Sequence, residues 1–242
     1  MGGLDSTLRA LVALSAIVLA DAEAGRLAIQ QEPGYVVSEY AGRRFYPTGV
    51  AHLDTALAYV GAVERGGNNR GPQVDRFLRS VGIRSAAPWC AAFTSYVRRA
   101  AAEATGREVG PFEPSGRPHY GAVATRHLSF GGTVSAADVW RGAASVPPGA
   151  LVVWRNGTGW TGHVGLVWKD DDPESEGFAP GDRSPDALRW RHRCGVTVEG
   201  NTSSGRAGSQ RDGGGVYTRE RCVSHGYFRI VGFALANRRP AR

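Results

Sequence analysis

The sequence predicts an α+β fold in which N-terminal helices pack on an antiparallel β-sheet. Apolar residues recur with a helical period in the segments up to residue 101, and they alternate with a period of two in short runs after residue 146. Helices that come first and strands that follow favour this arrangement. The length of 242 residues and the hydrophobic share of 42% suit one domain with an additional segment.

Residues 1–47 precede the predicted domain. Residues 1–24 contain a short apolar run between Arg9 and small residues, which resembles a signal peptide; an N-terminal helix that stays on the protein is the alternative. The run is too short to span a membrane comfortably, so we expect no stable insertion after removal of a leader. We expect a secreted, periplasmic or cell-wall-associated protein, with a phage or cytoplasmic origin as the alternative. Residues 25–47 show little pattern and are expected to form a linker or arm.

Two helices are predicted before residue 84. In residues 49–64 the helical spacing joins Leu53, Leu57, Val60 and Val63. Residues 66–83 read as a turn followed by a helix, with Pro72 in the first turn, where proline is favoured.

The third predicted helix carries a cysteine near its start. In the stretch PWCAAFTSYVRRAA, Pro88 suits the first helical position, which places Cys90 in the first turn. One apolar face is formed by Trp89, Ala92, Phe93, Tyr96, Val97 and Ala100. Cys90 lies beside this face rather than at its centre.

Four runs after residue 146 are predicted strands: 147–155, 162–168, 195–201 and 226–235. In the second run, His163 shares a face with Gly165 and Val167. In the third run, Glu199 lies on the face of Thr197, and Asn201 shares that face if the strand continues.

The remaining segments are expected to be loops. Residues 102–146 include one short helix near residues 135–144. Residues 169–193 form an acidic loop, and residues 202–221 form a loop rich in glycine and arginine.

The net charge of +7 is carried almost entirely by arginine. A basic surface suits a polyanionic partner such as nucleic acid or the bacterial wall. The charges are scattered, with no basic helix and no alternation of basic and aromatic residues, so we expect no nucleic-acid partner.

The three cysteines are Cys90, Cys194 and Cys222. An odd number in an exported protein allows one pair and leaves one thiol. Cys194 and Cys222 both lie near strand-like runs, whereas Cys90 has different surroundings. The expected disulfide therefore joins Cys194 and Cys222 and leaves Cys90 free.

Cys90 is the candidate nucleophile. A helix N-terminus lowers a thiol pKa because its N–H groups and dipole favour the thiolate. Such a thiolate needs a base held by a third polar group, and His163 with Glu199 or Asn201 could supply both. The alternatives are a thiol that fills space, a structural histidine and a solvent-facing carboxylate.

The motifs PWCAAFTSYV, PPGALVVW, GHVGLV and VEGNT, in this order, resemble the CHAP-type cysteine amidohydrolase/peptidase group, which is related to NlpC/P60 enzymes and has a papain-like fold. The resemblance implies a catalytic domain over residues 48–238. It implies that Cys90 is the nucleophile, His163 the general base, Glu199 its orienting group and Asn201 a further polar member. We expect Trp89, Trp160 and Gly162 to contact the substrate.

The resemblance also implies cleavage of peptidoglycan amide bonds, either between muramic acid and L-alanine or within the stem or cross-bridge peptides. An acyl- or amidotransferase with the same Cys–His site and a non-catalytic wall-binding module are the alternatives. We expect no cofactor and no metal site, because the sequence has no HExxH, no CxxC and no paired histidine spacing.

Overall fold

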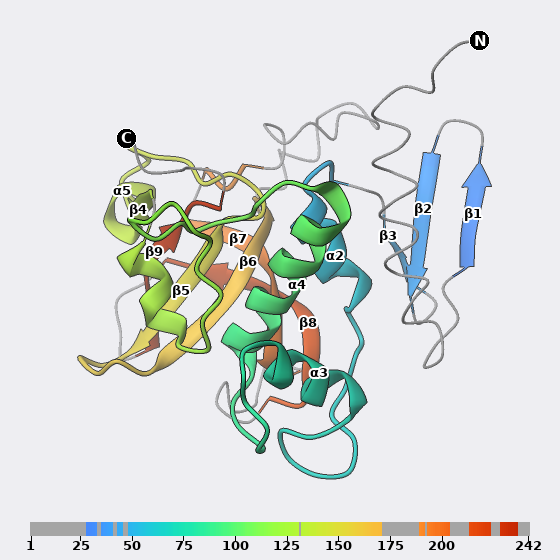
Figure 1. The fold of residues 1–242 in the computed structure, drawn as a ribbon. Helices are drawn as coiled ribbons and strands as arrows, with labels where there is room; N and C mark the ends of the chain where they lie inside the picture. The colour runs from blue at the N-terminus through green and yellow to red at the C-terminus, as the bar shows by residue number, and fades with distance from the viewer. Residues whose placement is uncertain are drawn as a thin grey trace.

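The computed structural model describes residues 28–32, 35–40, 43–45, 48–130, 132–170, 189–191, 193–203, 213–223 and 228–236 (Figure 1). The expected leader, residues 1–24, and most of the acidic loop lie outside these residues. The chain combines helices with an antiparallel sheet, so the α+β expectation is confirmed. Within the described segments, no helix has both the length and the apolar character that a bilayer span requires.

The helices α2 (Ala51–Ala58), α3 (Pro72–Ser80) and α4 (Cys90–Thr105) lie together in Figure 1, in front of the sheet. Pro72 is the first residue of α3, as the sequence predicts, and the preceding Gly71 has a φ of 126° that favours glycine. The prediction for Pro88 is wrong, because Trp89 caps α4 in a non-helical conformation and Pro88 precedes it. Cys90 nevertheless lies in the first turn, as its first residue.

The first helix is shorter than predicted. It ends at Ala58, and Gly61 has a φ of 98°, which a helix cannot contain. The chain then runs beside the strand that begins at Gly215, and the N–H of Gly61 donates to the Val216 carbonyl at 2.9 Å. Val63, predicted on the apolar face of the helix, instead forms a bridge with Gly215 and is 39% exposed.

A six-stranded antiparallel sheet has the order β4-β9-β5-β6-β7-β8. Its strands are β4 (Thr133–Ser135), β5 (Leu151–Asn156), β6 (Gly162–Asp170), β7 (Cys194–Thr202), β8 (Gly215–Cys222) and β9 (Phe228–Ala234). The four predicted strands correspond to β5, β6, β7 and β9. The predicted short helix is α5 (Ala136–Trp140), and the 3₁₀ helix η1 (Ala124–Ser129) and β4 lie in the stretch expected to be mostly loops.

The strand β8 corrects the expected loop over residues 202–221. Its sequence GVYTRERC mixes polar and non-polar residues on both sides of the alternation, so it carries little hydrophobic signal. The segment is a strand because it pairs with β7, from Cys194 opposite Cys222 to Thr202 opposite Gly215.

The segment expected to be a linker or arm contains regular structure. The strands β1 (Ala28–Glu32), β2 (Tyr35–Tyr40) and β3 (Arg43–Phe45) pair in order as an antiparallel sheet separate from the six-stranded one (Figure 1).

The sheet has a hydrophobic cluster on each face, as the alternation in β5 and β6 requires. One cluster joins the helices to the sheet through Leu151, Val153, Val164, Leu166 and Val198. The other is formed with α5 by Val152, Trp154, Val167, Trp190 and Phe233. Both faces of the central strands are therefore covered by buried side chains.

Candidate active site

Cys90 lies at the N-terminus of α4, where the first backbone N–H groups have no acceptor inside the helix. Its thiol is free, and the residue is 7% exposed. Backbone hydrogen bonds from Ala91 and from Val164 of β6 act on the sulfur. The tertiary structure therefore places the thiol beside the start of β6, where His163 is the second residue.

His163 contacts both of its expected partners. Its Nε2 lies 3.0 Å from Oε2 of Glu199, and a side-chain hydrogen bond joins it to Cys90. Because Nε2 faces the carboxylate, Nδ1 is the ring nitrogen left for the thiol. His163 is 2% exposed. The structure thus brings the predicted nucleophile, base and orienting group into one connected set.

Glu199 is completely buried on β7, and hydrogen-bond donors contact both of its carboxylate oxygens. Arg221 of β8 donates from Nε to Oε1 at 2.6 Å and from Nη2 to Oε2 at 2.7 Å. The hydroxyl of Thr197 also donates to Oε1 at 2.6 Å. Burial alone raises the pKa of Glu199, but the hydrogen bonds and charges of Arg221 and His163 hold that pKa well below its usual range.

The pKa values of the reacting pair shift in opposite directions. Burial raises the pKa of the Cys90 thiol, but the charge and hydrogen bond of His163 outweigh it, so the thiol pKa lies below its usual value. Burial lowers the pKa of His163, but Cys90 and Glu199 outweigh it and raise that pKa. These directions favour a thiolate–imidazolium pair.

Gly165 makes room for the carboxylate. A Cβ at this position would lie 2.7 Å from Cγ of Glu199 and 3.0 Å from the backbone oxygen of Val198. The absence of a side chain thus lets β7 bring Glu199 toward the imidazole of His163.

Gly162 has a similar explanation within the sheet. Its Cβ would lie 2.0 Å from the carbonyl oxygen of Trp154, which belongs to the paired strand β5. Strand pairing therefore accounts for this glycine.

Asn201 departs from the predicted alternation. It has a φ of 58°, and the β7–β8 register shifts between Glu199 and Thr202. The residue is 1% exposed, and its Oδ1 has no hydrogen-bond partner among the described residues. Glu199, rather than Asn201, is thus the residue that faces Nε2 of His163.

The two tryptophans expected at the substrate have opposite environments. Trp89 is completely buried, stacks among core aromatic rings and donates from Nε1 to Glu64 at 2.8 Å. Trp89 therefore has no exposed surface in this structure, and its expected substrate contact stays a prediction. Trp160 is 72% exposed in the β5–β6 connection, and its carbonyl accepts from Thr125 at 2.6 Å.

Sequence reasoning missed Thr197, Arg221 and Trp154 as members of the site. The ring centroids of Trp154 and His163 are 5.3 Å apart, and Cζ of Arg221 lies 5.5 Å from the Trp154 centroid. Trp154 is 3% exposed and packs against the buried imidazole. The alternation of residues 215–222 was the available signal, because it places Tyr217, Arg219 and Arg221 on one side of a strand.

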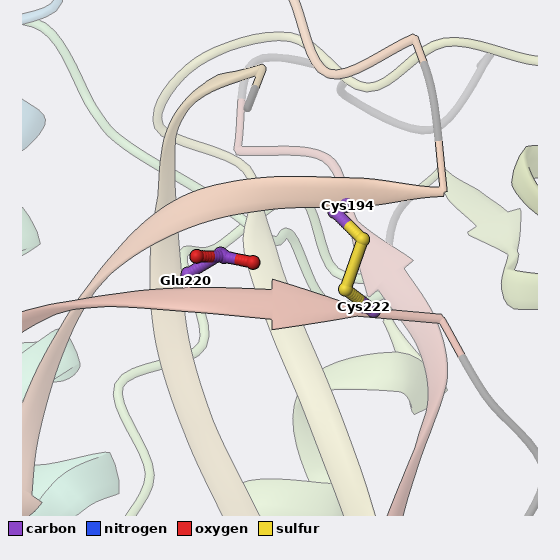
Figure 2. A group of neighbouring side chains, drawn as sticks. All are labelled: Cys194, Glu220 and Cys222. Atoms are coloured by element: carbon purple, nitrogen blue, oxygen red, sulfur yellow. A yellow bond between two sulfur atoms is a disulfide. The ribbon is translucent and has the colours of Figure 1, made fainter. Parts of the chain in front are cut away.

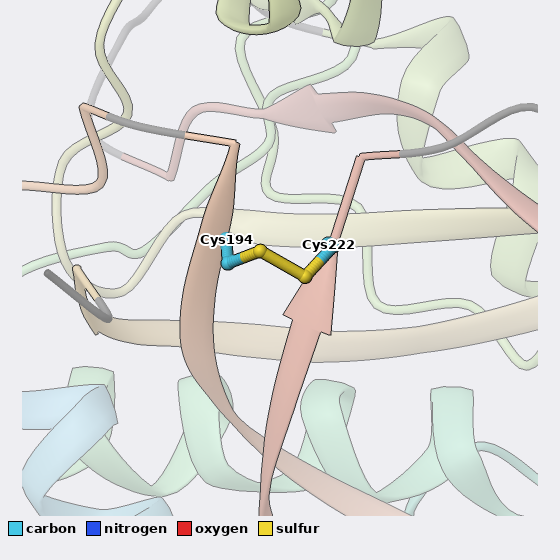
Figure 3. Close-up of a disulfide and its surroundings, with 2 residues drawn as sticks. All are labelled: Cys194 and Cys222. Carbon is cyan, nitrogen blue, oxygen red and sulfur yellow. A yellow bond between two sulfur atoms is a disulfide. The ribbon is translucent and has the colours of Figure 1, made fainter.

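The expected disulfide joins Cys194 and Cys222, with an S–S distance of 2.05 Å and a Cα separation of 4.0 Å (Figure 3). The two residues are direct partners at one end of the β7–β8 pair. Glu220 lies beside them (Figure 2), and the three form a group of potential metal ligands within the described residues. Metal binding by cysteine needs a thiolate, which the disulfide removes.

Comparisons of the chain with protein-family models, curated proteins and solved structures find no match. The geometry of the site therefore carries the functional argument.

Proposed function

We propose that this protein is a CHAP-like cysteine hydrolase with a papain-like fold that cleaves amide bonds in peptidoglycan. One observation carries the proposal: the buried connection from Cys90 through His163 to Glu199, with the thiol at a helix N-terminus. A nucleophile, a base and a group that orients the base, in mutual contact, define the arrangement that covalent acyl transfer requires.

The chemistry follows from the two pKa shifts. The Cys90 thiolate attacks the amide carbonyl carbon, and the imidazolium of His163 protonates the departing amine nitrogen as the C–N bond breaks. The resulting thioester is hydrolysed by a water molecule that gives its proton to neutral His163. The backbone N–H of Cys90, directed out of the helix terminus, is the proposed donor to the oxyanion.

The proposed substrate class has three supports. The ordered motifs around Cys90, His163 and Glu199 resemble enzymes that act on the bacterial wall. The net charge of +7 attracts an anionic polymer. Trp160 exposes an aromatic surface three residues before His163, and such a ring can pack on a sugar or a peptide side chain.

The test is mass spectrometry of purified peptidoglycan after incubation with the wild type and with Cys90→Ala. We expect new amine and carboxyl termini from the wild type only, and the fragment masses identify the bond. The double variant Cys194→Ala/Cys222→Ala is the control for loss of a cysteine outside the site, and it should retain cleavage at a temperature where it is folded.

Two other results would replace the proposal. Fragments that carry an added amine, when one is supplied, would indicate an acyl- or amidotransferase. Wall binding by the wild type and by Cys90→Ala, without fragments from either, would indicate a non-catalytic wall-binding module.

A further inference from the structure

We propose that Arg221 is a positioning residue of this site: its two hydrogen bonds hold Glu199 toward His163, and its charge favours the thiolate of Cys90. The inference rests on the proposed function for its effect on turnover. Its effect on the ionisation of Cys90 can be measured without any substrate.

The geometry of the clamp is specific. Arg221 donates from Nε to one carboxylate oxygen of Glu199 and from Nη2 to the other, at 2.6 and 2.7 Å. A guanidinium that engages both oxygens fixes the plane of a carboxylate, which a single donor does not. The oxygen that accepts from Nη2 is the one that faces Nε2 of His163, at 3.0 Å.

The neighbouring structure holds the clamp in place. Arg221 directly precedes Cys222, whose disulfide to Cys194 joins β8 to β7. Its guanidinium lies over the ring of Trp154, which also contacts His163. The side chain is 15% exposed, so water screens its charge only weakly.

The charges explain why the clamp matters for the thiol. When Cys90 and His163 are ionised, the thiolate, imidazolium, carboxylate and guanidinium sum to zero. Without Arg221, the same buried set carries one net negative charge, which disfavours the thiolate. Thr197 donates a hydrogen bond to the carboxylate but brings no charge.

The charged groups that act on this set come from each surrounding element of the described chain. They are Cys90 on α4, His163 on β6, Glu199 on β7, and Arg219 and Arg221 on β8. Arg219 acts on Glu199 through its charge, whereas Arg221 also donates the two hydrogen bonds. This difference makes Arg219 the matched control.

The experiment measures the rate of Cys90 alkylation by iodoacetamide against pH in the folded wild type, Arg221→Gln, Arg221→Lys and Arg219→Gln. Circular dichroism and thermal melts identify the temperature at which every variant is folded. Turnover on purified peptidoglycan is measured in parallel, with kcat and KM separated.

We expect Arg221→Gln to raise the thiol pKa by about one unit, which lowers the alkylation rate on the acid side about tenfold. Its kcat should fall at least as far, with little change in KM. Arg221→Lys keeps the charge without the two-point contact, so its thiol pKa should stay near that of the wild type while kcat is intermediate. Arg219→Gln should shift the thiol pKa by less than half of the Arg221→Gln shift.

A wild-type alkylation profile and a wild-type kcat in Arg221→Gln, with only a lower melting temperature, would overturn the inference and leave Arg221 a structural role. Equal shifts in Arg219→Gln and Arg221→Gln would also overturn it, because general charge would then be sufficient. If wild-type protein cleaves no wall while the alkylation profiles shift as expected, the proposed function fails and the positioning role stands. If the unfolding of Arg221→Gln prevents its measurement, Arg221→Lys decides: a wild-type kcat contradicts the proposal, and an intermediate kcat supports it.

Discussion

The site depends on which group each of the two ring nitrogens of His163 contacts. Nε2 faces Glu199 at 3.0 Å, and the opposite side of the ring bonds to the Cys90 thiol. The imidazole therefore cannot rotate without losing one of these contacts. Both contacts are buried, so water replaces them poorly.

The first prediction compares the loss of activity when Glu199 or Asn201 is replaced. Cys90→Ala should abolish turnover, because no covalent route is left. Glu199→Gln should keep a small activity and Glu199→Ala less, since loss of the orienting group in a Ser-His-Asp triad costs ~10⁴ in rate and a pre-ionised thiolate depends on it less. Wall hydrolysis with a thermal melt measures both.

Asn201→Ala should be closer to wild type than Glu199→Ala, because Nε2 of His163 faces Glu199 and the side-chain oxygen of Asn201 has no hydrogen-bond partner among the described residues. An inactive, folded Asn201→Ala beside a fully active Glu199→Ala would reverse the two assignments.

The second prediction is a bell-shaped dependence of kcat/KM on pH. The pKa of Cys90 is lowered, so activity should fall as the pH drops through that lowered value and the thiolate takes up a proton. The pKa of His163 is raised to about 9, so activity should fall again as the pH rises through that value. A rate that rises steadily through pH 9 would show that the imidazolium is not needed.

At the scale of the elements, the contact between β6 and β7 requires a glycine at position 165. Gly165→Ala would put a Cβ 2.7 Å from Cγ of Glu199 and 3.0 Å from the backbone oxygen of Val198. We expect at least a tenfold loss of kcat, since displacement of a positioning group by an ångström has effects of about this size or more.

Gly214→Ala is the matched control for this third prediction, because a Cβ there meets nothing within 4 Å. Equal activities of the two alanine variants, measured by wall hydrolysis, would show that the position of Glu199 tolerates the shift.

The fourth prediction concerns the β7–β8 pair. The disulfide closes a segment with a sequence separation of 28 residues. Constraint of the unfolded chain over such a loop contributes about 3–4 kcal/mol to the free energy of unfolding. Urea unfolding of Cys194→Ala/Cys222→Ala should show a loss of this size, while Cys90→Ala should show a smaller one. A loss below about 1 kcal/mol would mean that strand pairing alone holds β8.

The whole molecule should lose stability in mild acid. His52 donates from Nε2 to the Gly149 carbonyl at 2.8 Å, and burial lowers the pKa of this histidine to about 4. Burial also lowers the pKa of His127 well below its usual value. In the unfolded chain, both histidines therefore bind a proton near pH 6, whereas in the folded chain they stay neutral. The free energy of unfolding thus falls as the pH drops.

Asp54 acts in the opposite direction, because burial raises its pKa to about 6. Between about pH 4.5 and 6 these three groups together give a difference of about one proton between the unfolded and the folded chain, which corresponds to about 1.4 kcal/mol of unfolding free energy per pH unit. Urea unfolding from pH 7 to pH 4.5 measures this fifth prediction. Asp54→Asn should steepen the slope toward two protons, and an unchanged slope would contradict the assignment.

The sequence by itself determined the local elements with strong periodicity. A turn followed by Pro72 predicted α3, helical spacing around Phe93 predicted α4, and alternation around His163 predicted β6. A face buried against one core repeats with the period of its own element. The order of Cys90, His163 and Glu199 identified the candidate site, since their chemistry is useful only in combination. The cysteine count was sufficient to propose the Cys194–Cys222 pair.

Only the tertiary structure decided where the weakly patterned segments lie. On β8, the importance of Arg221 follows from its contact with the buried carboxylate of Glu199. The local sequence does not predict this pair, because the two residues are 22 positions apart. The burial of Trp89 and the turn of the chain at Asn201 have the same origin. Local pattern reports the period of a segment, whereas the partner of a side chain depends on which distant strand packs beside it.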